Sequence, residues 1–302
     1  MPQPGLGGRR MYYTRGRGLG GPSSMNGMIY IRGNARDYDG WRQLGLEGWA
    51  YDDVLPYFKR AGDSARGDGE FHGGGGPLRT HPSANYNAID RMFMDVESQA
   101  GLALNLDFNG ESQIGRGVYD VTIRGGRRCS AEQAYLAPVH GRPNLPVITG
   151  AHATHLRIDE DRAQGVIYEC CGQTVEARAD REIILALGTF GTPRLMMLSG
   201  IGPGAELRRH GIAVIADLPD LQIFFTPMVM IEDPNGPFNQ QQARSLFDLR
   251  ALGRTFLVRG QHAISGYQVD SNLMGPESLG RLTLRSADPR DYPAIDPQFL
   301  RA

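Results

Sequence analysis

Glycine dominates the opening of this chain and limits what that part can form. Nine of the first 33 residues are glycine, with a polar, arginine-rich filling between them. Glycine loses more backbone freedom on folding than any other residue and has no side chain to bury. The opening therefore predicts an extended segment that exposes its backbone, so the helices and strands of a core must lie further along.

Two segments in the first half carry clear helix signals. Acidic residues open Asp52–Arg60 and basic residues close it, which suits the helix dipole, and Gly62 follows as a stop. Apolar residues recur at helical spacing in Asn85–Ala100, just before Gly101. Between them, the glycine-rich stretch Gly67–Pro77 predicts a flexible surface loop.

The later helices are predicted from their first residues. Ser130 followed by Gln133 matches a capping box that opens a helix, and Pro138 ends that helix. Thr192 and Pro193 suit the cap and the first position of another helix. The predicted elements are a helix from Ser130 through Leu136, a helix at Arg194–Leu198 and a helix at Ala205–His210 that stops at Gly211.

Beyond Pro143 the pattern changes to β structure. Four short runs, broken by glycine and charged residues, predict a small antiparallel meander. Arg181–Leu187 (REIILAL) differs, because an aliphatic run without alternation is typical of a strand buried on both faces, as in a parallel sheet. Leu221–Ile231 and Arg281–Arg285 are two further predicted strands. The runs of the meander are Leu145–Thr149, Thr154–Ile158, Gln164–Glu169 and Gln173–Ala177.

Size and charge exclude several classes of protein. A chain of 302 residues predicts about two domains at roughly 150 residues each. The net charge of -1 leaves no field to attract nucleic acid or anionic lipid, and no apolar run reaches the length of a membrane span. Cys129, Cys170 and Cys171 have no CxxC spacing and no histidine cluster nearby. We therefore expect no metal site, reduced thiols and a cytoplasmic location.

The segment Gly16–Gly21 (GRGLGG) satisfies the pattern GxGxxG, in which glycines let a helix N-terminus approach a pyrophosphate. That fingerprint belongs between a buried strand and a helix. The flanking residues Met11–Thr14 and Pro22–Ser24 support neither element. The six residues alone therefore do not establish a nucleotide site.

A longer series of motifs is more specific. It comprises PQPGL at 2–6, RGRGLGGPSSMNGMIYIRGN at 15–34, DYDGW at 37–41, GGGPL at 74–78, DFNG at 107–110, GRRCSA at 126–131, RPNL at 142–145 and GTFGTPRLMMLSGIG at 188–202. In this series the chain resembles the glucose-methanol-choline (GMC) flavin oxidoreductases. Choline dehydrogenase-like and related alcohol dehydrogenases are the nearest subgroup, and the resemblance covers nearly the whole chain.

The resemblance implies FAD as the cofactor and a set of residues that line it. Glycines permit close approach of the backbone, and backbone N–H groups can satisfy phosphate oxygens. Pro22 stands where the family usually has a small hydroxyl residue or glycine, so one N–H donor toward the cofactor is lost. Gly18, Gly20, Gly21, Ser23, Asn26, Gly27, Met28 and Ile29 match residues along the FAD pyrophosphate and isoalloxazine, and Ala153 matches a main-chain contact to the adenine end.

The fold implied by the resemblance is α/β with mixed α+β character. A partial FAD-binding domain is expected in residues 1–60 and 140–219, and a partial substrate-binding domain with an antiparallel sheet in 61–139 and 220–302. Family members also carry an N-terminal GxGxxG unit, a further stretch after the position of Pro219 and a C-terminal catalytic histidine region, which this chain does not match. We therefore expect weak FAD affinity and no turnover.

The activity implied by the resemblance is oxidation of a primary alcohol to an aldehyde, with hydride passing to flavin N5. Choline, aliphatic, polymeric and sugar alcohols stay open as substrates, and oxygen and a quinone as electron acceptors. No catalytic residue is assigned, because none of the seven histidines lies in the family's HPxGT pattern. A noncatalytic remnant or binding module of the same fold, and a chain misassembled in gene prediction, are the alternatives. Bound flavin that an alcohol reduces would favour the enzyme. A colourless but folded protein would favour the noncatalytic module. A natural protein much heavier than this chain would favour an error in gene prediction.

Overall fold

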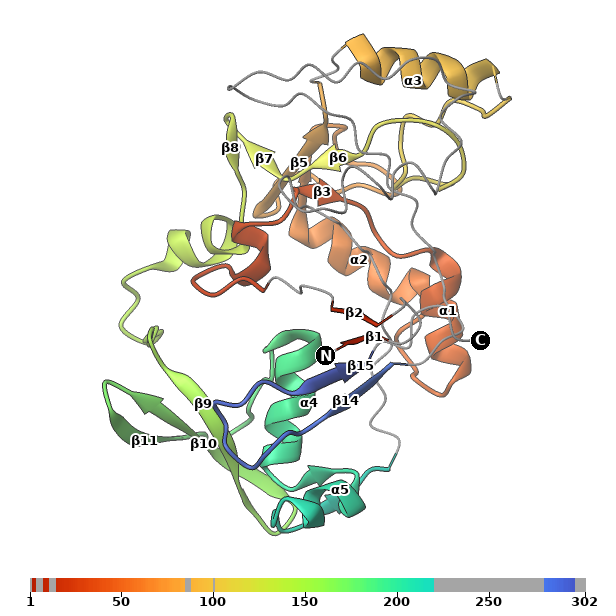
Figure 1. Ribbon diagram of the computed structural model, residues 1–302. Coiled ribbons are helices and arrows are strands. Elements are labelled where there is room, and N and C mark those ends of the chain that lie inside the picture. The colour runs from red at the N-terminus through yellow and green to blue at the C-terminus, as the bar shows by residue number, and fades with distance from the viewer. Residues whose placement is uncertain are drawn as a thin grey trace, which may run out of the picture. The chain divides into compact units, whose positions relative to one another are not determined.

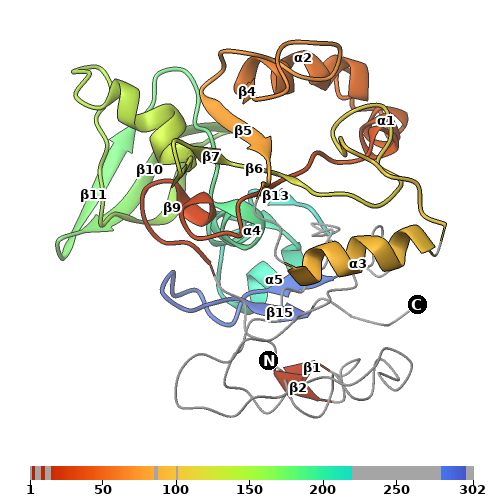
Figure 2. The same cartoon turned by 90° about the horizontal axis from the view of Figure 1, so that it is seen from above.

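The computed structural model describes residues 2–3, 8–10, 15–84, 88–99, 101–219 and 280–296. They belong to two compact units, Met1–Tyr12 with Gly150–Ala302 (unit 1) and Tyr13–Thr149 (unit 2). Figures 1 and 2 show the elements of both units in two views. Each unit combines helices with small, mostly antiparallel sheets, which confirms the predicted mixed α/β class. The assignment of residues to an FAD-binding and a substrate-binding domain stays a prediction.

Unit 2 is built on a four-stranded sheet in the order β3-β6-β5-β4. β4 and β5 run parallel, whereas β6 pairs antiparallel with β3 on one side and β5 on the other, so that Val121 lies between Ile29 and His81. The elements are a 3₁₀-helix Gly21–Ser24, β3 Ile29–Tyr30, α1 Ala35–Gln43, α2 Tyr51–Ala61, β4 Gly62–Ser64, β5 Leu78–Pro82, α3 Ala88–Gln99, β6 Asp120–Val121, β7 Ile123–Arg124, β8 Arg127–Arg128, a π-helix Glu132–Leu136 and a 3₁₀-helix Ala137–Val139.

The helices of unit 2 begin and end at their sequence signals. At the start of α2 the Asp53 carboxylate accepts a hydrogen bond from the backbone N–H of Ala50, the residue before the helix, at 3.0 Å. Gly62 follows the end of the helix. α3 ends just before Gly101, whose φ of 82° is left-handed and stops a helix. The predicted cap at Ser130 is confirmed, because its Oγ accepts the Gln133 N–H at 3.2 Å.

The loop predicted at Gly67–Pro77 is present, and it is packed rather than loose. The Gly76 N–H donates to the Gly62 carbonyl at 3.0 Å. A Cβ added to Gly73 would stand 1.9 Å from the carbonyl oxygen of Lys59 in α2. Glycine is therefore needed here because two stretches of backbone pass in direct contact.

Much of the buried part of unit 2 consists of polar, hydrogen-bonded side chains rather than apolar ones. The buried Arg32 donates from Nη1 to the Phe71 carbonyl at 2.6 Å, and its backbone N–H donates to Asn109 Oδ1 at 2.8 Å. The Asn109 amide also donates to the Tyr30 carbonyl at 3.1 Å. A buried polar group costs free energy unless it is bonded, so these contacts fix the loop that precedes α1.

A second polar network joins the loop after β4 to β6. Nε and Nη2 of Arg66 donate to the buried Asp120 carboxylate at 3.2 and 2.7 Å. The hydrogen bond and charge of Asp120 raise the pKa of the Arg66 guanidinium above its ordinary value. Asp107 lies 3.8 Å from Arg66 and 2.6 Å from Nε2 of the buried His72. His72 is thus part of this structural network.

Unit 1 contains the antiparallel meander. β9, β10 and β11 form a three-stranded sheet in the order β11-β10-β9, which confirms three of the four predicted runs. The first run, residues 145–149, is not a strand. The elements are β1 Pro2–Gln3, β2 Arg9–Arg10, β9 His152–Asp159, β10 Arg162–Cys170, β11 Gln173–Arg178, α4 Gly188–Leu198, β12 Ile201–Gly202, α5 Gly204–Arg209, β13 Ala216–Asp217, β14 Arg281–Thr283 and β15 Ala294–Asp296.

The apolar core of unit 1 lies around α4. This helix contacts both β9 and β14, as Figure 1 shows. Glu206 of α5 is buried beside the core, and its carboxylate accepts the Leu284 N–H at 2.5 Å. The buried core residues are Met197, Leu207, Leu282 and Leu284, and Phe190, Leu198, Ile212, Val214 and Ile295 pack against them.

Two predictions in unit 1 are wrong. Arg181–Leu187 is not a strand, and the Ile184 side chain is 81% exposed. A strand needs hydrogen-bonding neighbours, and no described segment pairs with this run. α4 begins at Gly188 rather than after Thr192, and the Thr192 hydroxyl instead accepts the Leu187 N–H at 3.1 Å. The strand predicted at Leu221–Ile231 lies outside the described residues.

Candidate functional site

A tight glycine turn opens the segment from residue 18 to residue 29. Gly18, Gly20 and Gly21 have φ values of 146°, 82° and 54°, which side-chain-bearing residues rarely adopt. The Gly21 N–H donates to the Gly18 carbonyl at 3.0 Å and closes the turn. Pro22 is the second residue of the 3₁₀-helix Gly21–Ser24, a position where a fixed φ is favourable and a missing N–H costs little. The segment is thus a folded loop and not a strand-to-helix nucleotide turn.

The outer side of this turn presents unused backbone donors. Within the part of the chain that the structure describes, the N–H groups of Gly18, Leu19 and Gly20 donate to no protein acceptor. A Cβ added at Gly18 or Gly21 would meet nothing within 4 Å, so the space beside the turn is open. Successive backbone N–H groups in such a turn form a concave donor set that suits phosphate oxygens. The exposed cation of Arg17 lies next to it in sequence.

The inner side of the turn is fastened to the segment before the π-helix. The Ser23 hydroxyl donates to the Gly20 carbonyl at 2.5 Å and accepts the Ala131 N–H at 2.9 Å. Its one proton is thus already used inside the protein. A Cβ at Gly20 would lie 2.4 Å from the Ser24 hydroxyl and 3.2 Å from Glu132, so only glycine fits there. Figures 1 and 2 both show this turn beside the π-helix.

Arg128 holds the middle of the segment. Its Nη1 donates to the Asn26 carbonyl at 2.7 Å, to Asn26 Oδ1 at 2.8 Å and to the Ser23 carbonyl at 3.3 Å. The sequence gives no sign of this role beyond the place of Arg128 in the motif at 126–131, which does not indicate its partner.

The end of the segment is fixed by the edge of the sheet. Met28 has a left-handed φ of 64°, which is uncommon for a residue with a side chain. Its N–H donates to Asn26 Oδ1 at 3.1 Å, and its carbonyl accepts the Thr122 N–H at 2.9 Å. Ile29 then enters β3. The Gly27 N–H has no protein acceptor among the described residues, so a further donor is available here.

Ala153 belongs to unit 1, whereas the other eight predicted residues belong to unit 2. It lies in β9, half-buried, opposite Tyr168 of β10. The Leu156 N–H of the same strand donates to the Ser199 hydroxyl at 2.8 Å. Ser199 is part of the motif at 188–202, so this motif helps to position β9. The other eight residues lie together in the folded segment 18–29 of unit 2.

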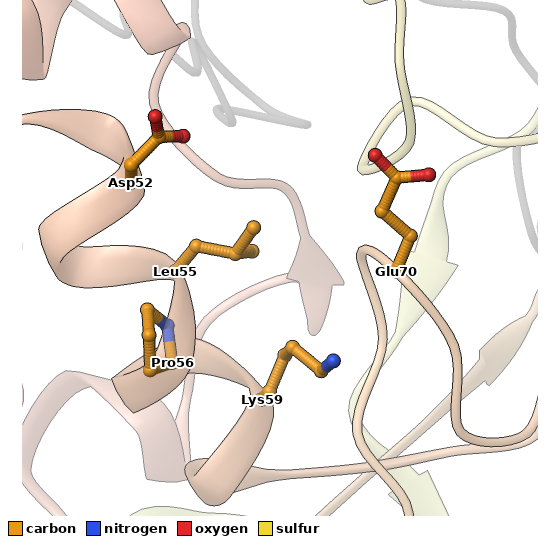
Figure 3. Close-up of a pocket in the computed structure, with 5 residues that line it drawn as sticks. All are labelled: Asp52, Leu55, Pro56, Lys59 and Glu70. Atoms are coloured by element: carbon orange, nitrogen blue, oxygen red, sulfur yellow. The ribbon is translucent and has the colours of Figure 1, made fainter.

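A separate shallow pocket of about 360 Å³ lies on α2 and contains none of the predicted residues. Figure 3 shows Leu55 and Lys59 pointing from the helix toward the loop that carries Glu70. Asp52 and Pro56 complete the lining. Within the described residues no three histidine, cysteine or acidic side chains are grouped to bind a metal. Among the described helices, none has the length and apolar character of a membrane span.

Comparison with known proteins places these features in a family. Residues 5–219 match the sequence profile of the GMC oxidoreductases. An oxygen-dependent choline dehydrogenase from Brucella anthropi is 36% identical over 344 residues, which cover 99% of this chain and 62% of that protein. The chain thus spans less than two thirds of this relative. The alignment is longer than the chain itself, which agrees with the internal stretch expected to be missing.

Two solved structures share the fold. Pyridoxine 4-oxidase from Mesorbium loti has a TM-score of 0.79 and 24% identity over 99% of this chain and 64% of its own. An FAD-dependent oxidoreductase from Chaetomium thermophilum has a TM-score of 0.78 and 24% identity over 99% of this chain and 68% of its own. The matched profile covers well over half of the sequence. The chain therefore belongs to the GMC oxidoreductase family.

Proposed function

We propose that this chain is an FAD-dependent oxidoreductase that acts on the CH–OH group of a primary alcohol. The observation that carries the proposal is the open glycine turn with three unused backbone N–H groups, at the position where the family resemblance expects the FAD pyrophosphate. Backbone donors and an adjacent arginine suit a doubly anionic group. The donor set therefore fits the cofactor.

The residues of the segment divide between two tasks. Gly18, Leu19 and Gly20 offer N–H groups to the pyrophosphate, and the Gly27 N–H is available to the flavin ring. Bound FAD supplies a hydride acceptor, so that the alcohol carbon is oxidised to an aldehyde. Leu19 and Ile29 are exposed apolar side chains that can exclude water from one side of the site. Ser23 and Arg128 keep the segment in shape rather than contacting the phosphates directly.

The remaining parts of the proposal follow the family. Ala153 contacts the adenine end through its main chain. Residues 1–60 and 140–219 contribute to the FAD-binding domain, and 61–139 and 220–302 to the substrate-binding domain. Because the relative from Brucella anthropi is named a choline dehydrogenase that depends on oxygen, choline and oxygen are the first substrate and acceptor to test. The location in the cytoplasm remains a proposal.

The alternative is a noncatalytic module of the same fold. The observation that favours it is the irregular, exposed run 181–187, where the sequence predicts a buried strand of the FAD-binding sheet. Within the described residues the longest parallel pairing is β4 with β5, in unit 2. Because the described residues of the proposed FAD-binding part hold no larger parallel sheet, weak binding of the cofactor is expected under this alternative.

A matched pair of variants tests cofactor binding. Leu19→Glu places a carboxylate among the proposed phosphate donors, at a side chain that is already 40% exposed. Repulsion of about 1 to 2 kcal/mol should weaken FAD binding about five- to thirtyfold. Leu44→Glu makes the same change at a 79% exposed site in the same unit and should leave binding unchanged.

The measurement is the visible flavin spectrum of the purified chain, titrated with FAD and then with choline in the absence of oxygen. A flavin band that choline bleaches supports the enzyme. A band that no alcohol bleaches supports the module. No flavin band on the protein after saturation with FAD and removal of the unbound cofactor, or equal binding by both variants, would contradict the assignment of the segment.

A further inference from the structure

Two adjacent cysteines occupy the tip of the β10–β11 hairpin in unit 1. Cys170 is the last residue of β10, and Cys171 follows it in the turn. Cys171 is exposed and Cys170 is half-buried. Their sulfur atoms lie 3.7 Å apart, within hydrogen-bonding distance for thiols. This hydrogen bond raises the pKa of the Cys170 thiol above its ordinary value. Neither residue belongs to the proposed FAD site.

The turn itself is unusual for a cysteine. Cys170 pairs with Gln173, so Cys171 and Gly172 are the two central residues of the hairpin. Both have positive φ, 52° and 77°, which is the signature of a type I′ turn. Asparagine, aspartate or glycine normally stands at the first of these positions, because a larger side chain is strained there. The strained backbone holds the second thiol beside the first.

A disulfide between neighbouring residues would be closed under strain. All described peptide bonds are trans, so adjacent Cα atoms lie about 3.8 Å apart. Ordinary disulfides span Cα separations of about 4.4 to 6.8 Å. A bond formed at shorter separation is strained, and strained or exposed disulfides are the ones that cellular thiols reduce readily. The geometry therefore suits a reversible bond and not a permanent structural one.

We propose that Cys170 and Cys171 form a redox site that a hydroperoxide closes to a disulfide and glutathione-type thiols reopen. One sulfur attacks the peroxide O–O bond, becomes a sulfenic acid and releases one water when the peroxide is hydrogen peroxide. The second thiol attacks the sulfenic sulfur, the S–S bond forms and a second water leaves. The two sulfurs supply both electrons that reduce the peroxide, and the thiol protons end in the two waters.

The reaction is confined to this pair. Cys129 is only 3% exposed and belongs to unit 2, where its Sγ lies 3.9 Å from the Pro77 carbonyl. Burial keeps it from solvent peroxide, so it serves as an internal reference. Ring closure also changes the turn between β10 and β11, because the backbone of Cys171 must move to bring the sulfurs into bonding distance.

The test uses the whole reduced chain and hydrogen peroxide as the probe. After a brief treatment the thiols are blocked with N-ethylmaleimide and the chain is cut with trypsin. Cleavage after Arg162 and Arg178 leaves both cysteines in one peptide, while Cys129 falls in another. We expect the 163–178 peptide to lose the mass of two hydrogen atoms and both blocking groups, and glutathione to restore both alkylation sites. The Cys129 peptide should stay alkylated throughout.

Variants and an unfolded control decide the interpretation. Cys171→Ser should abolish the loss of hydrogen, whereas Cys129→Ser should not affect it. The pair should close several times faster in the folded chain than in urea, because the turn holds the sulfurs together. Three results would each overturn the proposal: oxygen addition without disulfide, linkage only between two chains, or equal rates in urea. None of these readouts depends on flavin, so failure here is distinct from failure of the FAD proposal.

Discussion

The hydrogen bonds of Arg128 give a quantitative prediction for the candidate site. Arg128→Ala removes the two short contacts to Asn26, at 2.7 and 2.8 Å, and the longer one to Ser23. A hydrogen bond to a charged group contributes about 1.5 to 3 kcal/mol when buried. Exposure lowers this toward about 0.5 to 1 kcal/mol for each of the two short contacts, because Arg128 is only half-buried, and the 3.3 Å contact adds little. The Arg128 side chain therefore raises the free energy of opening the segment by about 1 to 2 kcal/mol.

Hydrogen–deuterium exchange measures this directly and needs no cofactor. Local opening that becomes easier by about 1 to 2 kcal/mol should speed exchange at residues 24–28 about five- to thirtyfold. FAD affinity should fall by a similar factor if the segment binds it. Arg127→Ala is the matched control, since that side chain is exposed and makes no side-chain hydrogen bond within the described residues. Equal exchange in the two variants would show that Arg128 does not hold the segment.

Three further predictions concern stability. Gly73→Ala should destabilise the chain by about 3 kcal/mol, because its Cβ would stand 1.9 Å from the Lys59 carbonyl, whereas Gly69→Ala meets nothing within 4 Å; thermal unfolding compares them. Burial raises the pKa of the Tyr38 hydroxyl above its ordinary 10.0, so the folded state keeps this proton to higher pH than the unfolded state. The stability that this raised pKa contributes is complete below pH 10 and is lost as the pH rises through the folded-state pKa. The free energy of unfolding, measured with urea, should therefore decline over this range. An equally steep decline with pH in Tyr38→Phe would contradict the explanation. Cys171→Asn should stabilise the hairpin by about 0.5 kcal/mol, since asparagine tolerates the left-handed conformation, and a lower melting temperature would disprove that explanation.

Short-range signals predicted most of the described helices. Gly62 and Gly101 each follow a helix end as expected, because a residue without a side chain accepts the left-handed or extended backbone that ends a helix. The hairpins of the meander follow in the same way from alternating runs between short turns. Such signals operate within a few residues, so a single sequence is sufficient to read them.

Signals that depend on distant partners were misread or missed. The run 181–187 has the composition of a buried strand, yet a strand exists only where neighbouring strands bond to it, and the described residues provide none. The motif resemblance located the segment at 18–29 but gave no reason for its shape. Nor did the resemblance, which places Ser23 along the FAD, indicate that its hydroxyl donates to the Gly20 carbonyl.

Local chemistry thus settles where the glycine turn lies and which backbone conformations it can adopt, since Gly18, Gly20 and Gly21 are the residues that tolerate them. Folding alone decides which side of that turn is open. Asn26 and Arg128 are 102 residues apart in the chain, and only the packed sheet and π-helix bring them within 2.7 Å. Contacts over such separations depend on how whole elements pack, and no periodicity or spacing in the sequence encodes them.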